Sequence, residues 1–210
     1  MDLKLYYSPG ACSLASHIVL EEMGFPYTTQ KLNLMEGEQR KPEYLALNPM
    51  GRVPTLVVDG KPLTENPAIL TFLGGAFPKK GLWPKETWEQ AMLLSALSWC
   101  SNTIHPAYGH MIRAGRYVDS SSAQESVKVK GREMFVEYLK MVDGWLAKTP
   151  KWMMGQQYTV GDPYLLVFYR WGHRNGLPMK DLKNYTRHAQ LVLARPAVRK
   201  VMADEGITLD

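Results

Sequence analysis

The chain has 210 residues, 45% of them hydrophobic and 21% charged, as is typical of a soluble globular protein with one large or two small domains. No apolar run reaches the ~20 residues needed to span a bilayer, and no secretory signal is visible. Two cysteines, Cys12 and Cys100, give no disulfide framework and suit a reducing cytoplasm, where we expect the protein to reside. The net charge of +5 comes without a nucleic-acid-binding motif, so we expect neither nucleic acid nor a membrane as partner.

The first 78 residues alternate between strand and helix patterns. Leu3–Tyr7 alternates apolar and polar residues as a short strand does, and Ser13–Met23 has helical spacing that stops at Gly24. A second strand is predicted over Tyr27–Leu32, and residues 36–46 indicate no more than a short irregular helix.

The next segment predicts a hairpin and a helix. Thr55–Val58 and Lys61–Leu63 flank Asp59-Gly60, which is a two-residue turn signal of type I′. Asn66-Pro67 is typical of an N-cap followed by proline, and it opens a helix predicted to reach about Phe72. The order β-α-β-α-β-β-α predicts a mixed four-stranded sheet.

Beyond a linker at residues 79–84, residues 85–210 predict an all-helical part. The first long helix carries Trp88, Met92, Ser95, Trp99 and Thr103 on one face, which we assign to core packing, and Pro106 should kink or interrupt it. Further helices are indicated by the stripe Phe135, Leu139, Val142 and Leu146, by the capping box Thr159–Asp162, and by residues 185–194 and 196–204. The capping box makes a structural role for Asp162 more plausible than a catalytic one.

Three segments of the first part suit a small zwitterionic peptide that bears a thiol. Cys12 stands at the start of a helix, where the dipole favours a thiolate and lowers the thiol pKa. A cis bond at Val53-Pro54 would leave the Val53 backbone free to pair with a peptide. Glu65 can hold an ammonium group, and the N–H groups of the helix that starts at Asn66 can bind a carboxylate.

The order and spacing of these segments match a known family. The segments are YYSPGACSLASH at residues 6–17, NPMGRVPTL at 48–56 and TENPAI at 64–69, with Thr159–Asp162 and Arg195-Pro196 in the second part. With these motifs the chain resembles the glutathione S-transferases over nearly its whole length, and most closely the bacterial β class.

The resemblance implies an architecture and a set of partners. It implies a thioredoxin-like N-terminal domain at residues 1–78, which binds glutathione, and an all-α domain at residues 85–210, which lines the acceptor-substrate site. It also implies a homodimer, with glutathione as co-substrate. His110, His173 and His188 lack partners at metal-ligand spacing, so we expect no metal.

The resemblance also assigns site residues. Val53 is expected to pair with the cysteinyl unit of glutathione beside a cis Pro54, and Glu65 and Asn66 to bind its γ-glutamyl end. Cys12 matches a cysteine able to form a mixed disulfide with glutathione. His105 matches a histidine that reaches towards the same site.

We therefore expect a transferase that attaches the glutathione thiolate to small hydrophobic electrophiles. The N–H groups at Cys12 and Ser13, with the Ser13 hydroxyl, would stabilise the thiolate, and Cys12 would add thiol-transferase or peroxidase activity. One departure is that Glu36 and Gly37 stand where the β class has a lysine, with Arg40 or Lys41 as replacements. The alternatives are a non-catalytic ligand- or partner-binding protein on the same fold and a specialised glutathione-dependent isomerase or dehalogenase.

Overall fold

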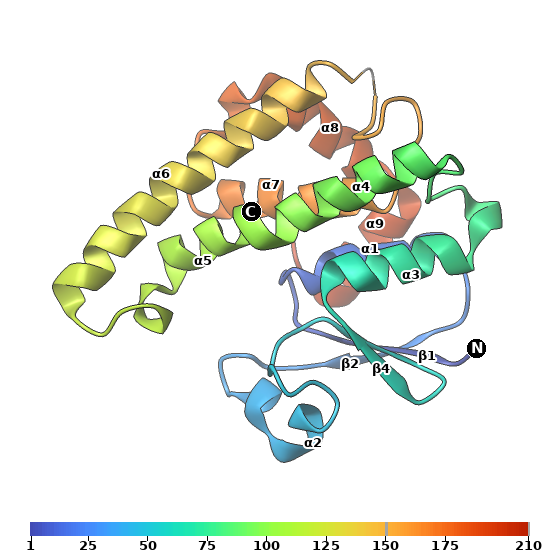
Figure 1. The fold of residues 1–210 in the computed structure, drawn as a ribbon, viewed down its shortest axis with the longest axis horizontal. Helices are drawn as coiled ribbons and strands as arrows, with labels where there is room; N and C mark the ends of the chain where they lie inside the picture. Colours follow the sequence, from blue (N-terminus) through green and yellow to red (C-terminus); the bar gives the residue numbers. More distant parts are fainter. Residues whose placement is uncertain (150, 210) are drawn as a thin grey trace.

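The computed structural model describes residues 1–149 and 151–209, and it places a small sheet beneath a larger layer of helices (Figure 1). The sheet has the strand order β2-β1-β3-β4. Strand β1 pairs in parallel with β2 and antiparallel with β3, which confirms the predicted mixed four-stranded sheet. The strands are β1 (Leu3–Tyr7), β2 (Thr28–Lys31), β3 (Thr55–Val58) and β4 (Lys61–Thr64).

The β3–β4 hairpin turns as its sequence predicts. Asp59 has φ 47° and Gly60 has φ 80°, so both turn residues are left-handed, as a type I′ turn requires. This hairpin places the segment after β4 at the start of the next helix. It thereby brings Glu65 to the same end of the sheet as the loop that follows β1.

Helices cover both faces of the sheet. Helices α1 (Ser13–Met23) and α3 (Asn66–Ala76) lie between the sheet and the helical layer, and the short α2 (Pro42–Leu45) lies on the opposite face (Figure 1). A 3-10 turn at Glu38–Arg40 precedes α2, so the irregular helix predicted for this segment is confirmed. Helix α1 ends as predicted at Gly24, which has φ 60° and donates its N–H to the Glu21 carbonyl.

The start of α3 differs from the prediction. Glu65, not Asn66, is the N-cap, and Asn66 is the first helical residue. The Asn66 side chain bonds instead to two groups outside its own helix: its Nδ2 donates to the Cys12 carbonyl at 2.8 Å, and its Oδ1 accepts from Ser16 Oγ at 2.7 Å. The helix also runs to Ala76, four residues beyond the predicted end at Phe72, because Leu73 and Gly74 still pack in the core.

The second part is helical, and Pro106 interrupts its first long helix as predicted. The interruption is a π-helical turn at Cys100–Ile104, which leads into a helix whose second residue is this proline. The helices are α4 (Thr87–Trp99), α5 (His105–Ile112), α6 (Ser121–Leu146), α7 (Gly161–Arg174), α8 (Lys183–Leu193) and α9 (Pro196–Glu205). Short 3-10 turns lie at Pro78–Lys80, Ala114–Arg116 and Met179–Asp181.

The face of α4 chosen from its aromatic and methionine residues is not the buried one. Trp88 is 76% exposed and Met92 is 47% exposed, whereas Leu93, Leu97 and Cys100 are buried. The assignment of Trp88 and Met92 to the core is therefore wrong. Helix α4 instead turns its aliphatic side towards α7, with Leu93 and Leu97 at the buried positions. None of the described helices combines the length and apolar character that crossing a bilayer requires.

The two parts share one hydrophobic core. Helix α7 is buried from Gly161 to Gly172 and packs against α1, α4 and α8. Helix α1 in turn packs against α7 and α9, so the segment that follows β1 is fixed from both parts of the chain.

Candidate functional site

The loop between β1 and α1 is held rigidly from several sides. The Ser13 hydroxyl accepts from the Ser8 N–H and donates to the Ser8 carbonyl, both at 3.2 Å. Gly10, at φ 66°, donates its N–H to the Glu205 carboxylate at 2.8 Å, and its carbonyl accepts from Trp171 Nε1 at 3.0 Å. Because the Ser13 hydroxyl is committed to Ser8, it shapes the loop in this structure, and only backbone N–H groups of this helix start are left to face a ligand.

Cys12 lies at the start of α1, where the sequence places it, but its thiol is not the expected thiolate. Burial raises the pKa of Cys12 to about 12, and the nearby Arg113 opposes this rise only in part. Sγ donates to the Val53 carbonyl at 3.3 Å. The prediction of a lowered pKa is therefore wrong: loss of water around the sulfur outweighs the helix dipole.

The Val53-Pro54 peptide is cis, as predicted. Hydrogen bonds hold the loop around it in place: the Arg52 carbonyl accepts from the Tyr44 hydroxyl and from Asn48 Nδ2. Within residues 1–149 and 151–209 the Val53 N–H has no hydrogen-bond partner. The free Val53 N–H therefore lies near Cys12. The Cys12 sulfur contacts the carbonyl of Val53, although the two residues are 41 positions apart in the chain.

Glu65 and Asn66 lie beside Cys12 but have different environments. Glu65 is exposed and has φ 70°, a backbone conformation that costs a non-glycine residue roughly 1–3 kcal/mol and is concentrated at functional sites. Asn66 is buried and uses its side chain to join α3 to α1. Glu65 is therefore the side chain available to a ligand, whereas Asn66 positions the carbonyl of Cys12.

His105 opens α5 and lies across from the loop that carries Cys12. Its ring packs edge-on against Trp171 with the centroids 5.0 Å apart, and Trp171 in turn bonds to Gly10. Burial lowers the pKa of His105 to about 4, and the charges of Arg113, Arg52 and Arg116 contribute to the same direction. The imidazole is therefore neutral at pH 7.

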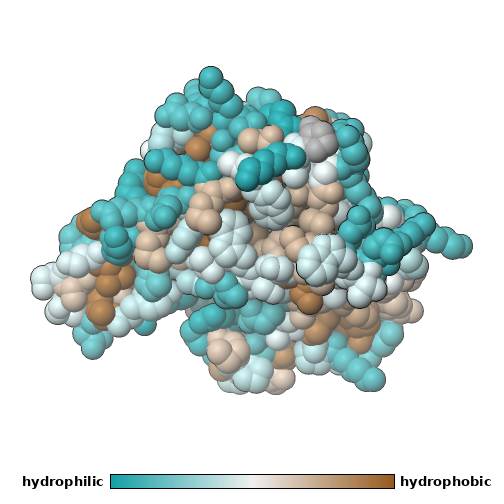
Figure 2. Space-filling model, turned by 45° about the horizontal axis from the view of Figure 1, so that its top comes forward, coloured by the Kyte–Doolittle hydropathy of each residue, from teal (hydrophilic) through white to brown (hydrophobic). Residues whose placement is uncertain are grey.

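Four arginines form a cationic cluster next to these groups, which we call the arginine cluster: Arg40, Arg52, Arg113 and Arg116. Arg113 and Arg116 follow α5 at the tip that projects from the molecule in Figure 2, and a notch separates this tip from the lobe with α2. The Arg40 side chain lies against Gly51, next to Arg52. Their charges act on one another, because Arg113, Arg52 and Arg40 all lower the pKa of Arg116, after burial.

No carboxylate neutralises this cluster in the part of the chain that the structure describes. Of the two replacements considered for the missing lysine, Lys41 is paired with Glu38 at 3.3 Å and Arg40 belongs to the cluster. Sequence reasoning missed Arg113. Its only signal is a pair of basic residues three apart, Arg113 and Arg116, just after a predicted helix.

The remaining candidates have structural settings. The His17 ring contacts the Glu205 carboxylate at 2.8 Å, and Cys100 is fully buried in the core. The Tyr6 ring packs at a tilt against Tyr44, with the ring centroids 5.6 Å apart. In the described residues, His, Cys, Asp and Glu side chains nowhere gather in a group of three that could hold a metal ion.

Comparisons with known proteins agree with this arrangement. The family described as glutathione S-transferase, N-terminal domain matches residues 1–75. The glutathione S-transferase GstA of Escherichia coli O157:H7 is 31% identical over 98% of this chain and 100% of its own length. A glutathione transferase homolog from Sulfitobacter with bound glutathione superposes with a TM-score of 0.92, at 32% identity over 98% of this chain and 99% of that chain.

A structure of a bacterial beta class glutathione S-transferase from Sphingomonas chungbukensis is also similar. It has a TM-score of 0.86 and 32% identity, covering 98% of this chain and 100% of that chain. Similarity at this identity over both full lengths, together with the thioredoxin-like sheet and the cis Val53-Pro54 peptide, shows that the chain belongs to the glutathione S-transferase family.

Proposed function

We propose that this family member conjugates glutathione to small hydrophobic electrophiles at the site bounded by Cys12, Val53 and Glu65. The observation that carries the proposal is the juxtaposition of three unsatisfied features: the free Val53 N–H, the strained and exposed Glu65, and the unpaired arginine cluster. Glutathione carries an ammonium group, a peptide and two carboxylates, so it supplies a partner for each of them.

Each residue has a defined task in this proposal. Val53 pairs through its backbone with the cysteinyl unit, and Glu65 binds the γ-glutamyl ammonium group. The N–H groups at the start of α3 face the γ-glutamyl carboxylate. Arg113, with the rest of the arginine cluster, takes the place of the missing lysine and faces the glycyl carboxylate.

The backbone at the start of α1 supplies the stabilisation of the glutathione thiolate. The Cys12 S–H already donates to the Val53 carbonyl, so the N–H groups at this helix start donate to the glutathione sulfur and make loss of its proton to solvent easier. The thiolate then forms a C–S bond with the electrophile, and the leaving group departs with its bonding electrons. His105, neutral at pH 7, lies on the acceptor side as a hydrogen-bonding group.

The raised pKa of Cys12 bears on the additional activity expected of this residue. A buried thiol near pKa 12 is a poor nucleophile at pH 7, which argues against Cys12-dependent thiol-transferase or peroxidase chemistry in the free protein. The free N–H and the arginine cluster would serve glutathione binding in a transferase and in a non-catalytic binding protein alike, so turnover in the conjugation assay separates these two. An isomerase or dehalogenase would use the same glutathione site and differ only in the acceptor.

The proposal extends to the domain boundaries, the cellular location and the oligomeric state. We propose a thioredoxin-like domain over residues 1–78, a linker at 79–84, a helical domain over 85–210, and a cytoplasmic homodimer. The exposed Trp88 and Met92 on α4 support the dimer, because a second copy would cover them. Light scattering in solution tests the oligomeric state.

Calorimetry with glutathione, followed by a conjugation assay with a generic aryl halide, tests the function. We expect Glu65→Gln to weaken glutathione binding roughly tenfold, because a charge-assisted hydrogen bond is lost. The matched control is Glu36→Gln, which removes an exposed carboxylate without a hydrogen bond or ion pair among the described residues and should leave binding unchanged. Absence of binding at millimolar glutathione would overturn the proposal.

A further inference from the structure

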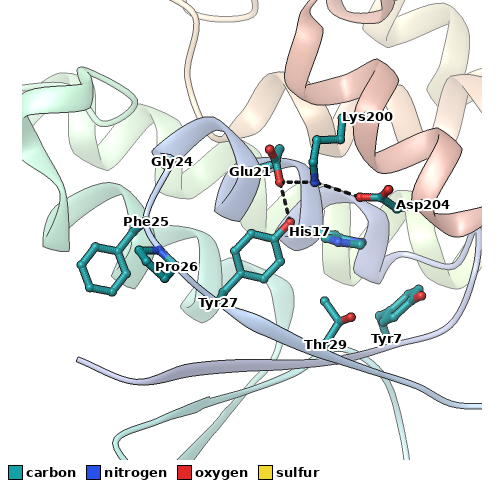
Figure 3. Close-up of a pocket in the computed structure, with 10 residues that line it drawn as sticks. All are labelled: Tyr7, His17, Glu21, Gly24, Phe25, Pro26, Tyr27, Thr29, Lys200 and Asp204. Atoms are coloured by element: carbon teal, nitrogen blue, oxygen red, sulfur yellow. Dashed lines mark hydrogen bonds and ion pairs between the residues drawn. The ribbon is translucent and has the colours of Figure 1, made fainter.

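A second hollow lies on the other side of α1, away from Cys12. It is an open groove of about 550 Å³ between α1, the start of β2 and α9, and it shares no lining residue with the glutathione site proposed above. Figure 3 shows the ring of His17 in its centre, with Tyr27 on one side and Tyr7 on the other. The volume is within the range of small-molecule sites.

Two buried polar side chains at the base of the groove lack partners for one atom each. His17 is 2% exposed and Tyr7 is 7% exposed, and their ring centroids are 5.0 Å apart. Within residues 1–149 and 151–209, neither the Tyr7 hydroxyl nor His17 Nε2 has a hydrogen-bond partner, and both residues line the groove. Neither atom is fully enclosed by protein, so both face the groove and are open to a ligand or to solvent.

The base of the groove favours positive charge. The buried Glu205 carboxylate accepts from His17 Nδ1 at 2.8 Å and from the Gly10 N–H at 2.8 Å. In the tautomer that carries its single proton on Nδ1, the His17 ring presents Nε2 to the groove as a hydrogen-bond acceptor. The nearby carboxylates of Glu205 and Asp204 raise the pKa of Tyr7, in addition to burial, which shows that their negative field reaches the groove.

At the rim, carboxylates outnumber cations. Lys200 Nζ lies 2.9 Å from Glu21 and 3.0 Å from Asp204, and the Tyr27 hydroxyl donates to the same Glu21 at 2.8 Å (Figure 3). Lys200 neutralises one of these two carboxylates, and Glu205 adds a third negative charge behind His17. The rings of Phe25 and Tyr27 supply an apolar wall on the side opposite Tyr7.

We propose that this groove is a binding site for an organic ammonium ion that carries an aromatic ring. The ammonium group donates to His17 Nε2 and the Tyr7 hydroxyl at the base, and the ring packs against Tyr27 and Phe25. The site is independent of the proposed transferase activity, since it uses neither Cys12 nor Val53.

Tyramine is the probe, and 3-(4-hydroxyphenyl)propanoate, which replaces its ammonium group with a carboxylate, is the matched control. In an NMR titration of the full chain we expect tyramine to shift the His17 ring resonances and to bind at least tenfold more tightly than the acid. Saturation with S-hexylglutathione should leave tyramine binding unchanged. Equal or tighter binding of the acid, displacement by S-hexylglutathione, or a titration without any shift at His17 would overturn the site.

Two substitutions at half-exposed positions are expected to change the affinity for tyramine in opposite directions. Asp204→Asn removes a negative charge and should weaken tyramine binding about threefold to fivefold, whereas Lys200→Gln removes the competing cation and should strengthen it by a similar factor. Lys61→Gln, on the opposite edge of the sheet, controls for overall charge. Thermal melting establishes that each variant is folded. The reverse pair of signs would indicate an anion site and contradict the proposal.

Discussion

The polar groups around Asp162 in the buried helix α7 are hydrogen-bonded to one another, whereas several of those around Cys12 have no partner among the described residues. The buried Asp162 carboxylate accepts from Met153 N, from Thr159 N and Oγ1, and from His188 Nε2, at distances of 2.7 to 3.2 Å. Around Cys12 the arginine cluster has no carboxylate among the described residues, and the Val53 N–H has no acceptor. The four donors to Asp162 hold the fold, whereas the open Val53 N–H and the exposed arginine cluster are groups to which a ligand can bring a partner.

The largest expected effect is the loss of stability when the hydrogen-bonded Asp162 is replaced. Asp162→Ala leaves His188 and two backbone N–H groups buried without an acceptor, so we expect the free energy of unfolding to fall by about 3–5 kcal/mol. Denaturant unfolding measures the loss, and Asp181→Ala at an exposed position is the control. Turnover per folded molecule should be unchanged. Selective loss of turnover with full stability would mean that Asp162 is catalytic.

A smaller effect is expected where the two regions meet. Asn66→Ala removes the bonds to the Cys12 carbonyl and to Ser16, both buried, and should cost about 2–3 kcal/mol. Unlike the change at Asp162, it should also lower the affinity for glutathione, because the start of α1 loses its tie to α3. Unfolding curves and calorimetry on the same sample separate the two effects. A loss of stability with unchanged affinity would assign Asn66 to the core alone.

The pH dependence of stability tests the environment of His105, which lies across from the loop that carries Cys12. Its folded pKa, about 4, lies below the 6.5 of a free histidine, so the unfolded chain takes up a proton first as the pH falls. The stability it contributes is present above pH 6.5 and is lost towards pH 4, by on the order of 3 kcal/mol. The stability of His105→Gln relative to the parent should therefore rise over this range. A constant difference would place the ring in water.

The same contrast explains what the sequence could predict. The mixed four-stranded sheet, the type I′ turn and the cis Val53-Pro54 peptide depend on local residues and family motifs, and all were predicted correctly. The pKa of Cys12 was predicted with the wrong sign because burial comes from segments distant in the chain. Arg113 was missed for the same reason: its role depends on the tip after α5 lying across from the loop that carries Cys12, and no local pattern records this.

The last prediction concerns the arginine cluster itself. The charge of Arg113 acts on Cys12, where it lowers the pKa against the effect of burial. Arg113→Gln should therefore raise the pKa of this thiol further, and it should weaken glutathione binding about fivefold by removing one charged contact. Stability should stay within about 0.5 kcal/mol, because the guanidinium is exposed and has no carboxylate partner among the described residues.

The matched control is Lys41→Gln, which removes an equally exposed cation that already has a partner in Glu38. Thiol alkylation rates against pH and calorimetry with glutathione measure the two expected changes. If Lys41→Gln weakened glutathione binding as much as Arg113→Gln, the attraction would reflect the net charge of the protein, and the unpaired cluster would have no special role. If only Arg113→Gln does so, the missing lysine of this family member has been replaced from the helical part of the chain.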